Sequence, residues 1–490
     1  MKIYLFTCLI LSNFLSFSQE NRALLRAHSK KELYRDFDLM ESALKESHPG
    51  LYWYTSYNNL EKIFEKNRGQ IKDGMNSYEF YRIISNVVSA DREGHSQVRS
   101  SKDIGEYIHQ KAKYLPFAIK TINKKIYLLN DIGNRKTKGK IITKINKTPI
   151  DTILSTIFEN TSRYSDGYST TGKYKNIDRF SFAGYYVDFI SDFQSSKTTI
   201  ELFNPKSNRL ENFEINLVNR DSLVQIAKQT PRQKQKNADK LYNLEINKKE
   251  EITLLQFNNA DFRDYKKGGM DFRKEMESVF KRIENSKIQN LIIDVRNLSG
   301  SSEGFEDYVF SYLTNKPFAK YKYVEAKSNR FSFLNHSNYK DSSEELNKLL
   351  DEELYQTNDG RYLRKSYYAE VEKPKPNAFL GNLYILISGK TYSGGSEFAS
   401  LVKNYRKATF IGEETGGGFY GQTSGMYINL ELPNTRISLR IPILKFATIF
   451  ESKDIPFGRG VIPNYIVYQS YEDFIIGIYS EMEFVFKLIV

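Results

Sequence analysis

Leu383–Gly418 reads LYILISGKTYSGGSEFASLVKNYRKATFIGEETGGG. The apolar run 383–387 is typical of a short buried strand, and Ser388-Gly389-Lys390 supplies the residues of a turn. Helical spacing follows in the apolar positions Phe398, Leu401, Val402 and Tyr405. Another apolar run lies at 409–411. The stretch therefore predicts a strand, a tight turn, a helix and a second strand.

Ser393 lies at the predicted turn into this helix and is followed directly by Gly394 and Gly395. A serine hydroxyl at such a turn is clear of the sheet, and the N–H of Gly394 can face a developing oxyanion at the positive end of the helix. Small residues there allow a substrate carbonyl to come close. Taken alone, however, the local pattern favours an N-capping serine on an ordinary βα unit.

Three blocks of the chain resemble the S41 serine peptidases, which include the tail-specific or carboxyl-terminal processing peptidases and their tricorn-like relatives. The first block, Thr391–Ala399 with Ala408–Gly417, is similar to the nucleophile block of the family. The second, Leu291–Gly300, is similar to its DLRxNxGG strand and loop. The third, Gly460–Asn464, is similar to its terminal GVxPD motif. They occur in the order of the family and cover the C-terminal half. The resemblance implies an α/β fold with a ClpP/crotonase-like core and peptide-bond hydrolysis through an acyl-enzyme on Ser393.

A second oxyanion donor is predicted from the βα pattern that precedes the nucleophile. The strand Ile252–Phe257, an apolar helical stripe over 272–283 and the strand 291–295 indicate a right-handed parallel crossover. Ligands of such sheets bind at the carboxyl ends of the strands. Gly300 lies just past one of these ends, so its N–H is expected to join that of Gly394 in an oxyanion hole.

The resemblance also suggests the catalytic base. Many S41 peptidases use a Ser–Lys dyad, but Gly418 stands at the position of that lysine. Tricorn-like members instead take the base from a Gly-His-Ser or Gly-His-Thr element, which here is Gly94-His95-Ser96. The resemblance therefore implies His95 as base, with a surface turn histidine as the alternative. Glu451 is predicted to orient it, and three other acids stay open: Asp454, Glu413 and Glu414.

Other features of the sequence indicate where the protein is located and which partners and cofactors are not expected. Residues 1–18 have the charged start and apolar run of a cleaved signal peptide, with a lipoprotein anchor at Cys8, the one cysteine, as the competing interpretation. The formal charge is +13, but the Lys and Arg are dispersed, so no nucleic-acid partner is expected. No HExxH helix or phosphate loop occurs, so neither a metal nor a cofactor is predicted. No later stretch is apolar enough for a membrane span.

We predict four segments: a signal peptide at 1–18, a helical N-terminal domain at 19–100, a β-rich PDZ-like region and linker at 101–240, and an S41 peptidase-like catalytic core at 241–490. Within the third segment, Gly139–Lys147 resembles a GDxIxxING segment of PDZ-like domains, which bind peptides along a sheet edge. A non-binding insert is the alternative. Four further predictions follow from local patterns: strands at 185–190 and 198–203, a linker at 229–240, a lid or wall over 316–376, and a hairpin around Pro433–Thr435.

Two functions remain open. The first is an exported serine peptidase that acts on protein or peptide substrates. The second is a catalytically inactive S41-like protein that binds peptides or hydrophobic ligands, and the order Ser396-Glu397 favours it because the family usually places that Glu one position earlier. The sequence does not determine the substrate, the cleavage specificity or the oligomeric state.

Overall fold

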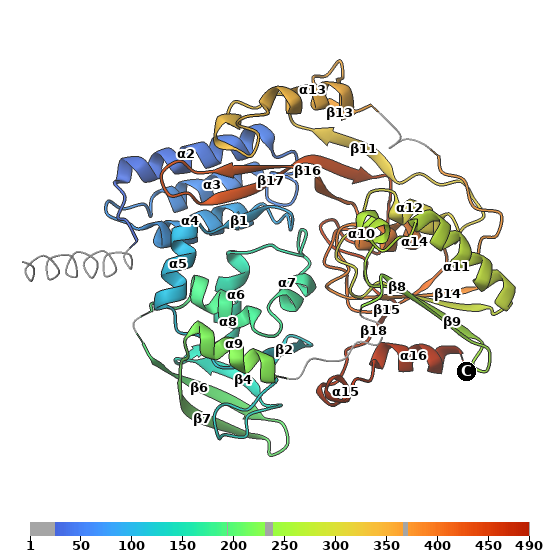
Figure 1. Ribbon diagram of the computed structural model, residues 1–490, viewed down its shortest axis with the longest axis horizontal. Helices are drawn as coiled ribbons and strands as arrows, with labels where there is room; N and C mark the ends of the chain where they lie inside the picture. The colour runs from blue at the N-terminus through green and yellow to red at the C-terminus, as the bar shows by residue number, and fades with distance from the viewer. Residues whose placement is uncertain (1–24, 194, 231–238, 366–370, 490) are drawn as a thin grey trace, which may run out of the picture.

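A computed structural model describes residues 25–193, 195–230, 239–365 and 371–489. These residues form three six-stranded sheets with helices packed on them (Figure 1). The predicted signal peptide lies outside the described residues, as do residues 231–238 of the predicted linker. Within the described part of the chain, no helix combines the length and the apolar character needed to cross a membrane.

The predicted catalytic core contains a sheet with the order β18-β15-β14-β10-β9-β8, in which only β8 is antiparallel to its neighbour. Its strands are β8 (Tyr242–Asn247), β9 (Ile252–Phe257), β10 (Asn290–Asp294), β14 (Asn382–Ile387), β15 (Thr409–Gly412) and β18 (Tyr465–Ile466). The helices are α10 (Phe262–Lys267), α11 (Phe272–Ser286), α12 (Phe305–Phe310), α14 (Gly394–Tyr405), α15 (Tyr471–Ile476) and α16 (Ser480–Ile489). The expected repeated βα units are confirmed.

Both faces of this sheet are covered, which explains why its central strands are apolar throughout. Leu291 and Ile293 of β10 pack with α11 and α14, whereas Ile292 between them packs with Val485 of α16 on the opposite face. Figure 1 shows α10, α11, α12 and α14 on one side of the sheet and α16 on the other. Because β10 and β14 are parallel neighbours, their carboxyl ends meet at one edge of the sheet, where the candidate nucleophile lies.

The β-rich region has an antiparallel sheet of order β2-β3-β4-β6-β7, with β5 beside β4. Its strands are β2 (Ile119–Ile122), β3 (Lys125–Leu128), β4 (Ile141–Ile145), β5 (Thr148–Pro149), β6 (Lys197–Asn204) and β7 (Arg209–Asn216). Its helices are α5 (Lys102–Lys111), α6 (Ile150–Glu159), α7 (Thr171–Asn176), α8 (Ser181–Phe189) and α9 (Arg220–Gln229). The predicted strand at 198–203 is confirmed within β6.

The predicted strand at 185–190 is wrong, because these residues belong mainly to α8. The buried side chains Phe182, Ala183, Tyr186 and Val187 recur at helical spacing and face the core of the β-rich region. A short apolar run fits a buried strand and a buried helix equally well, so periodicity over six residues could not separate them.

A third sheet joins the two ends of the chain, with the order β1-β17-β11-β13-β12 and β16 beside β17. Its strands are β1 (Gln97–Arg99), β11 (Tyr321–Ala326), β12 (Leu354–Gln356), β13 (Tyr362–Arg364), β16 (Gly421–Glu431) and β17 (Ser438–Thr448). The N-terminal helices α2 (Lys30–Ser47), α3 (Tyr57–Arg68) and α4 (Ser77–Ser89) share a hydrophobic core with it. The antiparallel pairing of β16 with β17 confirms the predicted hairpin.

The described residues of 316–376, for which the role of a lid or wall stays a prediction, form regular elements of the third sheet and its core. Besides β11, β12 and β13, the segment contains the 3-10 helix η2 (Leu334–His336) and α13 (Ser343–Glu353). Leu346 and Leu350 of α13 are buried in the core that the N-terminal helices share. Each element is too short to show a clear period by itself, and only the neighbouring strand β17 makes the segment part of a sheet.

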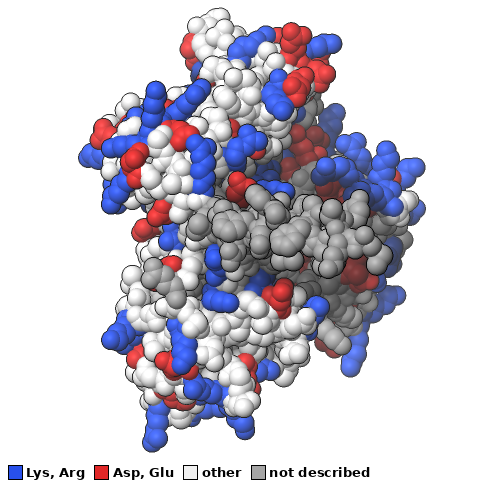
Figure 2. Space-filling model, turned by 60° about the vertical axis from the view of Figure 1, so that its left-hand side comes forward, with Lys and Arg blue, Asp and Glu red and all other residues white. Residues whose placement is uncertain are grey.

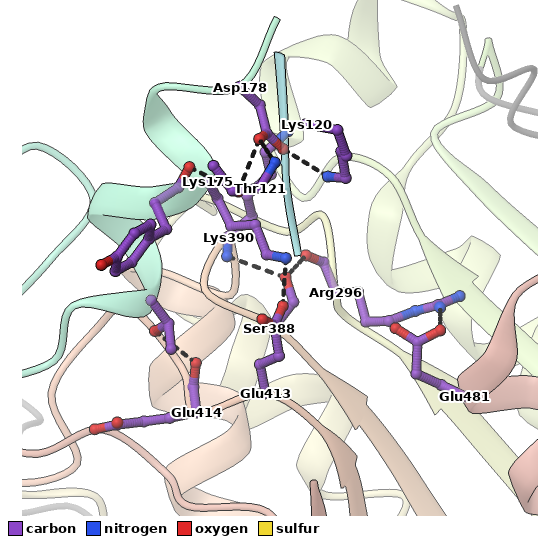
Figure 3. A network of polar contacts seen from close by, with 12 residues as sticks. Lys120, Thr121, Lys175, Asp178, Arg296, Ser388, Lys390, Glu413, Glu414 and Glu481 are labelled. Atoms are coloured by element: carbon purple, nitrogen blue, oxygen red, sulfur yellow. Dashed lines mark hydrogen bonds and ion pairs between the residues drawn. The ribbon is translucent and has the colours of Figure 1, made fainter. Parts of the chain in front are cut away.

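Charged side chains are spread over the surface. On the face drawn in Figure 2, Lys and Arg alternate with Asp and Glu. Figure 3 shows an ion pair between Lys175 of the β-rich region and Glu413 of the core. Within the β-rich region, Asp178 pairs with Lys120 at 2.5 Å. Arg296 at the end of β10 pairs with Glu481 of α16 at 2.8 Å.

Candidate active site

Ser393 occupies a strained turn at the start of α14. It is the residue before the first helical residue, and its φ of 53° and ψ of −128° lie outside the regions that non-glycine residues normally adopt. Such strain persists only where the surroundings impose it, and it is typical of a nucleophile elbow, which presents a serine hydroxyl above a sheet. Ser393 is half-buried, and its Oγ forms no hydrogen bond with the described residues.

Three hydrogen bonds tie this turn to the loop after β10. The N–H of Tyr392 donates to the Leu298 carbonyl at 3.1 Å. Thr391 Oγ1 donates to the Val295 carbonyl at 2.8 Å. Ser388 Oγ donates to the Arg296 carbonyl at 2.6 Å, as Figure 3 shows. The turn of the candidate nucleophile and the predicted oxyanion loop are therefore held as one unit.

Gly394 and Gly395 allow the same loop to approach the helix closely. A Cβ on Gly394 would lie 1.7 Å from Ser301 Oγ, and a Cβ on Gly395 would lie 2.2 Å from the Leu298 carbonyl oxygen. The sequence predicted small residues here so that a substrate could approach. The structure adds that these two glycines also make room for the loop from Leu298 to Ser301.

The two predicted oxyanion donors have free amides. Neither Gly394 N–H nor Gly300 N–H donates a hydrogen bond to an acceptor in the described residues. A Cβ built on Gly300 would meet no atom within 4 Å, so open space adjoins this residue. Both amides are thus available to a bound group.

His95 reaches the nucleophile turn from the N-terminal part of the chain. Its Nδ1 lies 2.9 Å from the hydroxyl oxygen of Tyr392, the residue before Ser393, and the two rings are 4.8 Å apart between centroids. The strand β1 that follows His95 pairs with β17 and places Gln97 opposite Arg440. His95 is only 7 % exposed, so the alternative of a surface turn histidine is wrong. No direct hydrogen bond joins His95 to Ser393.

Burial and the nearby Arg440 guanidinium lower the pKa of His95 to about 3. The imidazole is therefore neutral at pH 7, as a general base must be. His48 is a second buried histidine, and both of its ring nitrogens have hydrogen-bond partners close to His95 in the chain or beside His48 itself. Its Nδ1 accepts from the Gly50 N–H at 3.0 Å, and its Nε2 lies 2.9 Å from Ser96 Oγ. His48 therefore supports the segment that contains His95 and Ser96.

None of the four acids proposed from sequence contacts His95 among the described residues. Glu451 and Asp454 are exposed, and neither carboxyl forms a hydrogen bond or ion pair there. Glu413 pairs with Lys175 of the β-rich region. Glu414 pairs with Arg459 at 2.6 Å.

Asp166 is the carboxylate that lies next to this site, and sequence reasoning missed it. The residue is 0 % exposed, and its Oδ1 accepts from the Gly94 N–H at 3.0 Å and from the Tyr392 hydroxyl at 3.1 Å. Burial raises the pKa of Asp166 to about 6. It lies in the polar loop 160–170, which carries no motif. No local signal could have singled it out.

Gly418 cannot be replaced by the lysine of a Ser–Lys dyad without rearrangement. A Cβ there would lie 2.9 Å from the Gly421 carbonyl oxygen and 3.0 Å from the Tyr54 hydroxyl. The Gly418 N–H donates to Asp166 Oδ2 at 3.2 Å. The space that a lysine side chain would need is thus occupied, which agrees with a base that comes from elsewhere.

Comparison with known proteins identifies the family of the core and the type of fold. Residues 251–467 match the sequence model of peptidase family S41. Among solved structures, mature CPAF complexed with lactacystin superimposes with a TM-score of 0.61 at 14 % identity, covering 94 % of this chain and 98 % of that one. A mutant of CPAF gives a TM-score of 0.63 at 12 % identity, with coverage of 94 % and 97 %. At such low identity these structures show a shared fold.

The family match contains β10 with its loop, the Ser393 turn and the segment at Gly460, which are the three blocks that the sequence resemblance rested on. The described architecture, mixed helix and sheet with a parallel core, agrees with it. Residues 251–467 therefore form a core of the peptidase family S41 type, and the protein is a serine peptidase that acts on protein or peptide substrates.

Proposed function

We propose that the protein is an exported peptidase that cleaves peptide bonds through an acyl-enzyme on Ser393, with His95 as the general base. The strongest support is the approach of His95 to within 2.9 Å of Tyr392, directly before a strained Ser393. Catalytic hydrogen bonds are often long in the free enzyme and tighten when substrate binds. The missing direct bond between Ser393 and His95 is compatible with this behaviour.

In the proposed reaction, Ser393 Oγ attacks the carbonyl carbon of the scissile bond while His95 Nε2 takes the hydroxyl proton. The carbonyl oxygen becomes an oxyanion, which the N–H groups of Gly394 and Gly300 stabilise. When the tetrahedral intermediate collapses, His95 returns the proton to the leaving amine. A water molecule then attacks the acyl-enzyme with His95 again as base, and free Ser393 is regenerated.

Export is proposed from the sequence of residues 1–18, with cleavage before Gln19. If the full-length chain is expressed in a host with a secretion pathway, the mature protein should begin at Gln19, and N-terminal sequencing would detect this. Material that keeps Met1 and stays inside the cell would contradict export without affecting the catalytic proposal.

Labelling with a fluorophosphonate tests the nucleophile, because only an activated serine reacts with it. We expect labelling of the wild-type protein at Ser393, and we expect Ser393→Ala to abolish both labelling and casein hydrolysis. Ser400→Ala is a matched control, since Ser400 is buried on the same helix and its Oγ has no partner among the described residues. Casein hydrolysis by Ser393→Ala at near the wild-type rate would refute the assignment. A folded wild-type protein that is neither labelled nor active would favour the inactive binding protein.

A further inference from the structure

We propose that Asp166, acting through the hydroxyl of Tyr392, is the carboxylate that orients His95 and holds it in the tautomer needed for proton transfer. The proposal rests on the proposed roles of Ser393 and His95. It makes Tyr392 and Asp166 positioning residues, because neither touches the reacting atoms. The orienting acid would then come from the β-rich half of the chain and not from the C-terminal segment around Glu451.

The directions of the hydrogen bonds define the tautomer. An ionised carboxylate can only accept, so the Tyr392 hydroxyl donates its single proton to Asp166 Oδ1 at 3.1 Å. The same hydroxyl oxygen lies 2.9 Å from His95 Nδ1 and can there only accept. His95 must therefore carry its proton on Nδ1, which leaves the lone pair of Nε2 free to take the proton of Ser393.

Three hydrogen-bond donors, each from a different segment of the chain, hold the Asp166 carboxylate in this position. Besides the Tyr392 hydroxyl, it accepts from the N–H of Gly94, the neighbour of His95, and from the N–H of Gly418 in the loop after β15. Gly94 is also required sterically, because a Cβ there would lie 2.4 Å from the Tyr392 hydroxyl oxygen. One carboxylate thus connects the base, the nucleophile turn and the glycine loop.

The charges around His95 show why a carboxylate is needed. Arg440 lies over the ring of Tyr427 at 3.5 Å, and this ring is 6.2 Å from that of His95. The positive charge of Arg440 opposes the imidazolium that forms when His95 takes a proton. The negative charge of Asp166, which acts on His95 Nδ1 through the Tyr392 hydroxyl, offsets the destabilisation of the imidazolium by Arg440.

Two other buried acids lie close to Asp166. Burial, with Asp166 and Asp91 nearby, raises the pKa of Glu93 well above its usual range, which favours its neutral form. Asp91 lies 3.3 Å from His48 Nε2 and faces that histidine. With its pKa at about 6, Asp166 is mostly ionised at pH 7. Among these three acids, Asp166 is the one that bonds to the partner of His95.

Tyr392→Phe tests the relay by removing one hydroxyl while it keeps the ring. We expect the rate of fluorophosphonate labelling and kcat on casein to fall by about 100-fold, as expected when a base loses its correct tautomer, with KM nearly unchanged. Tyr265→Phe is the matched control, because Tyr265 is buried and its hydroxyl donates to the Asn259 carbonyl far from His95 in sequence and contacts. Asp166→Asn, which keeps the size but removes the charge, should reproduce the loss, and a thermal melt of each variant verifies folding.

The pH profile supplies a readout that a purely structural role would not move. In the wild-type protein kcat/KM should fall as the pH drops through about 6, because protonated Asp166 no longer accepts from all its donors. In Tyr392→Phe this step should disappear, since the carboxyl is disconnected from His95.

A folded Tyr392→Phe protein with wild-type labelling rate and pH profile would overturn the relay, even if Ser393→Ala is inactive and the peptidase assignment stands. A 100-fold loss in Glu451→Gln, with Tyr392→Phe unaffected, would overturn it in favour of Glu451. If wild-type protein shows no activity that depends on Ser393, the proposed function itself fails first.

Discussion

The contact between Gly394 and the oxyanion loop gives the sharpest prediction for catalysis. In Gly394→Ala the new Cβ would lie 1.7 Å from Ser301 Oγ and 2.6 Å from Ser301 Cβ. Rotation of the Ser301 side chain can relieve the first contact but not the second. Carbon atoms need roughly 3.5 Å, so the loop must move away by about 0.9 Å.

Such a shift would move the neighbouring Gly300 N–H away from the oxyanion. A misplacement of about 1 Å can cost roughly 100-fold in rate, and loss of one oxyanion donor costs about 100- to 1,000-fold. We therefore expect Gly394→Ala to lower kcat on casein by about 100-fold. Fluorophosphonate labelling measures the same effect without a known substrate, and a thermal melt checks the fold.

A compensating change makes this prediction specific. Ser301→Gly removes both atoms that clash, and the nearest remaining contact of the new Cβ is then the backbone nitrogen of residue 301 at 3.4 Å. The double variant Gly394→Ala/Ser301→Gly should recover most of the rate of the Ser301→Gly single variant. If Gly394→Ala keeps its full rate, or if the second change fails to restore it, the loop does not support the oxyanion in the way we infer.

Three further predictions concern the second donor, the buried base and the junction between regions. Gly300→Pro deletes the predicted donor and should lower kcat by at least about 100-fold, whereas Gly300→Ala keeps the amide and adds a Cβ into open space, so equal rates of the two variants would contradict the donor role. The pKa of His95 is about 3 when folded and about 6.5 when unfolded, so the unfolded chain binds more protons between these values and stability falls as the pH drops below 6.5. At pH 5 this contributes about 2 kcal/mol of destabilisation, which urea unfolding should detect as the difference in pH dependence between the wild-type protein and His95→Gln. Lys175→Met leaves the largely buried Glu413 without its cation and should destabilise the protein by about 2–4 kcal/mol, whereas the double variant with Glu413→Leu should recover much of this; equal melting of both variants would refute the coupling.

Local patterns in the sequence determined the parallel core and the position of the proposed nucleophile. The strand 383–387, the glycine-rich turn and the helix after Ser393 are all encoded within 36 residues of LYILISGKTYSGGSEFASLVKNYRKATFIGEETGGG, and each element was found where periodicity and turn chemistry predicted it. The sequence failed where an element was short. The run at 185–190 has too few residues to distinguish a helix from a strand, and the strands within 316–376 are too short to predict that they join a sheet.

Only the tertiary structure decided what surrounds the nucleophile. Tyr392 contacts His95, which is 297 residues away in the sequence, and Asp166, which is 226 residues away. Local sequence periodicity cannot predict contacts between such distant residues. The pairing of β1 with β17 buries His95 beside Arg440, which sets its protonation state. Likewise, Asp166 comes from a polar loop without a motif, and it became identifiable only when the fold placed it against Gly94, Gly418 and Tyr392. The turn that carries Ser393 is a local feature of the chain, whereas the environment of His95 is a product of contacts between segments that lie far apart in sequence.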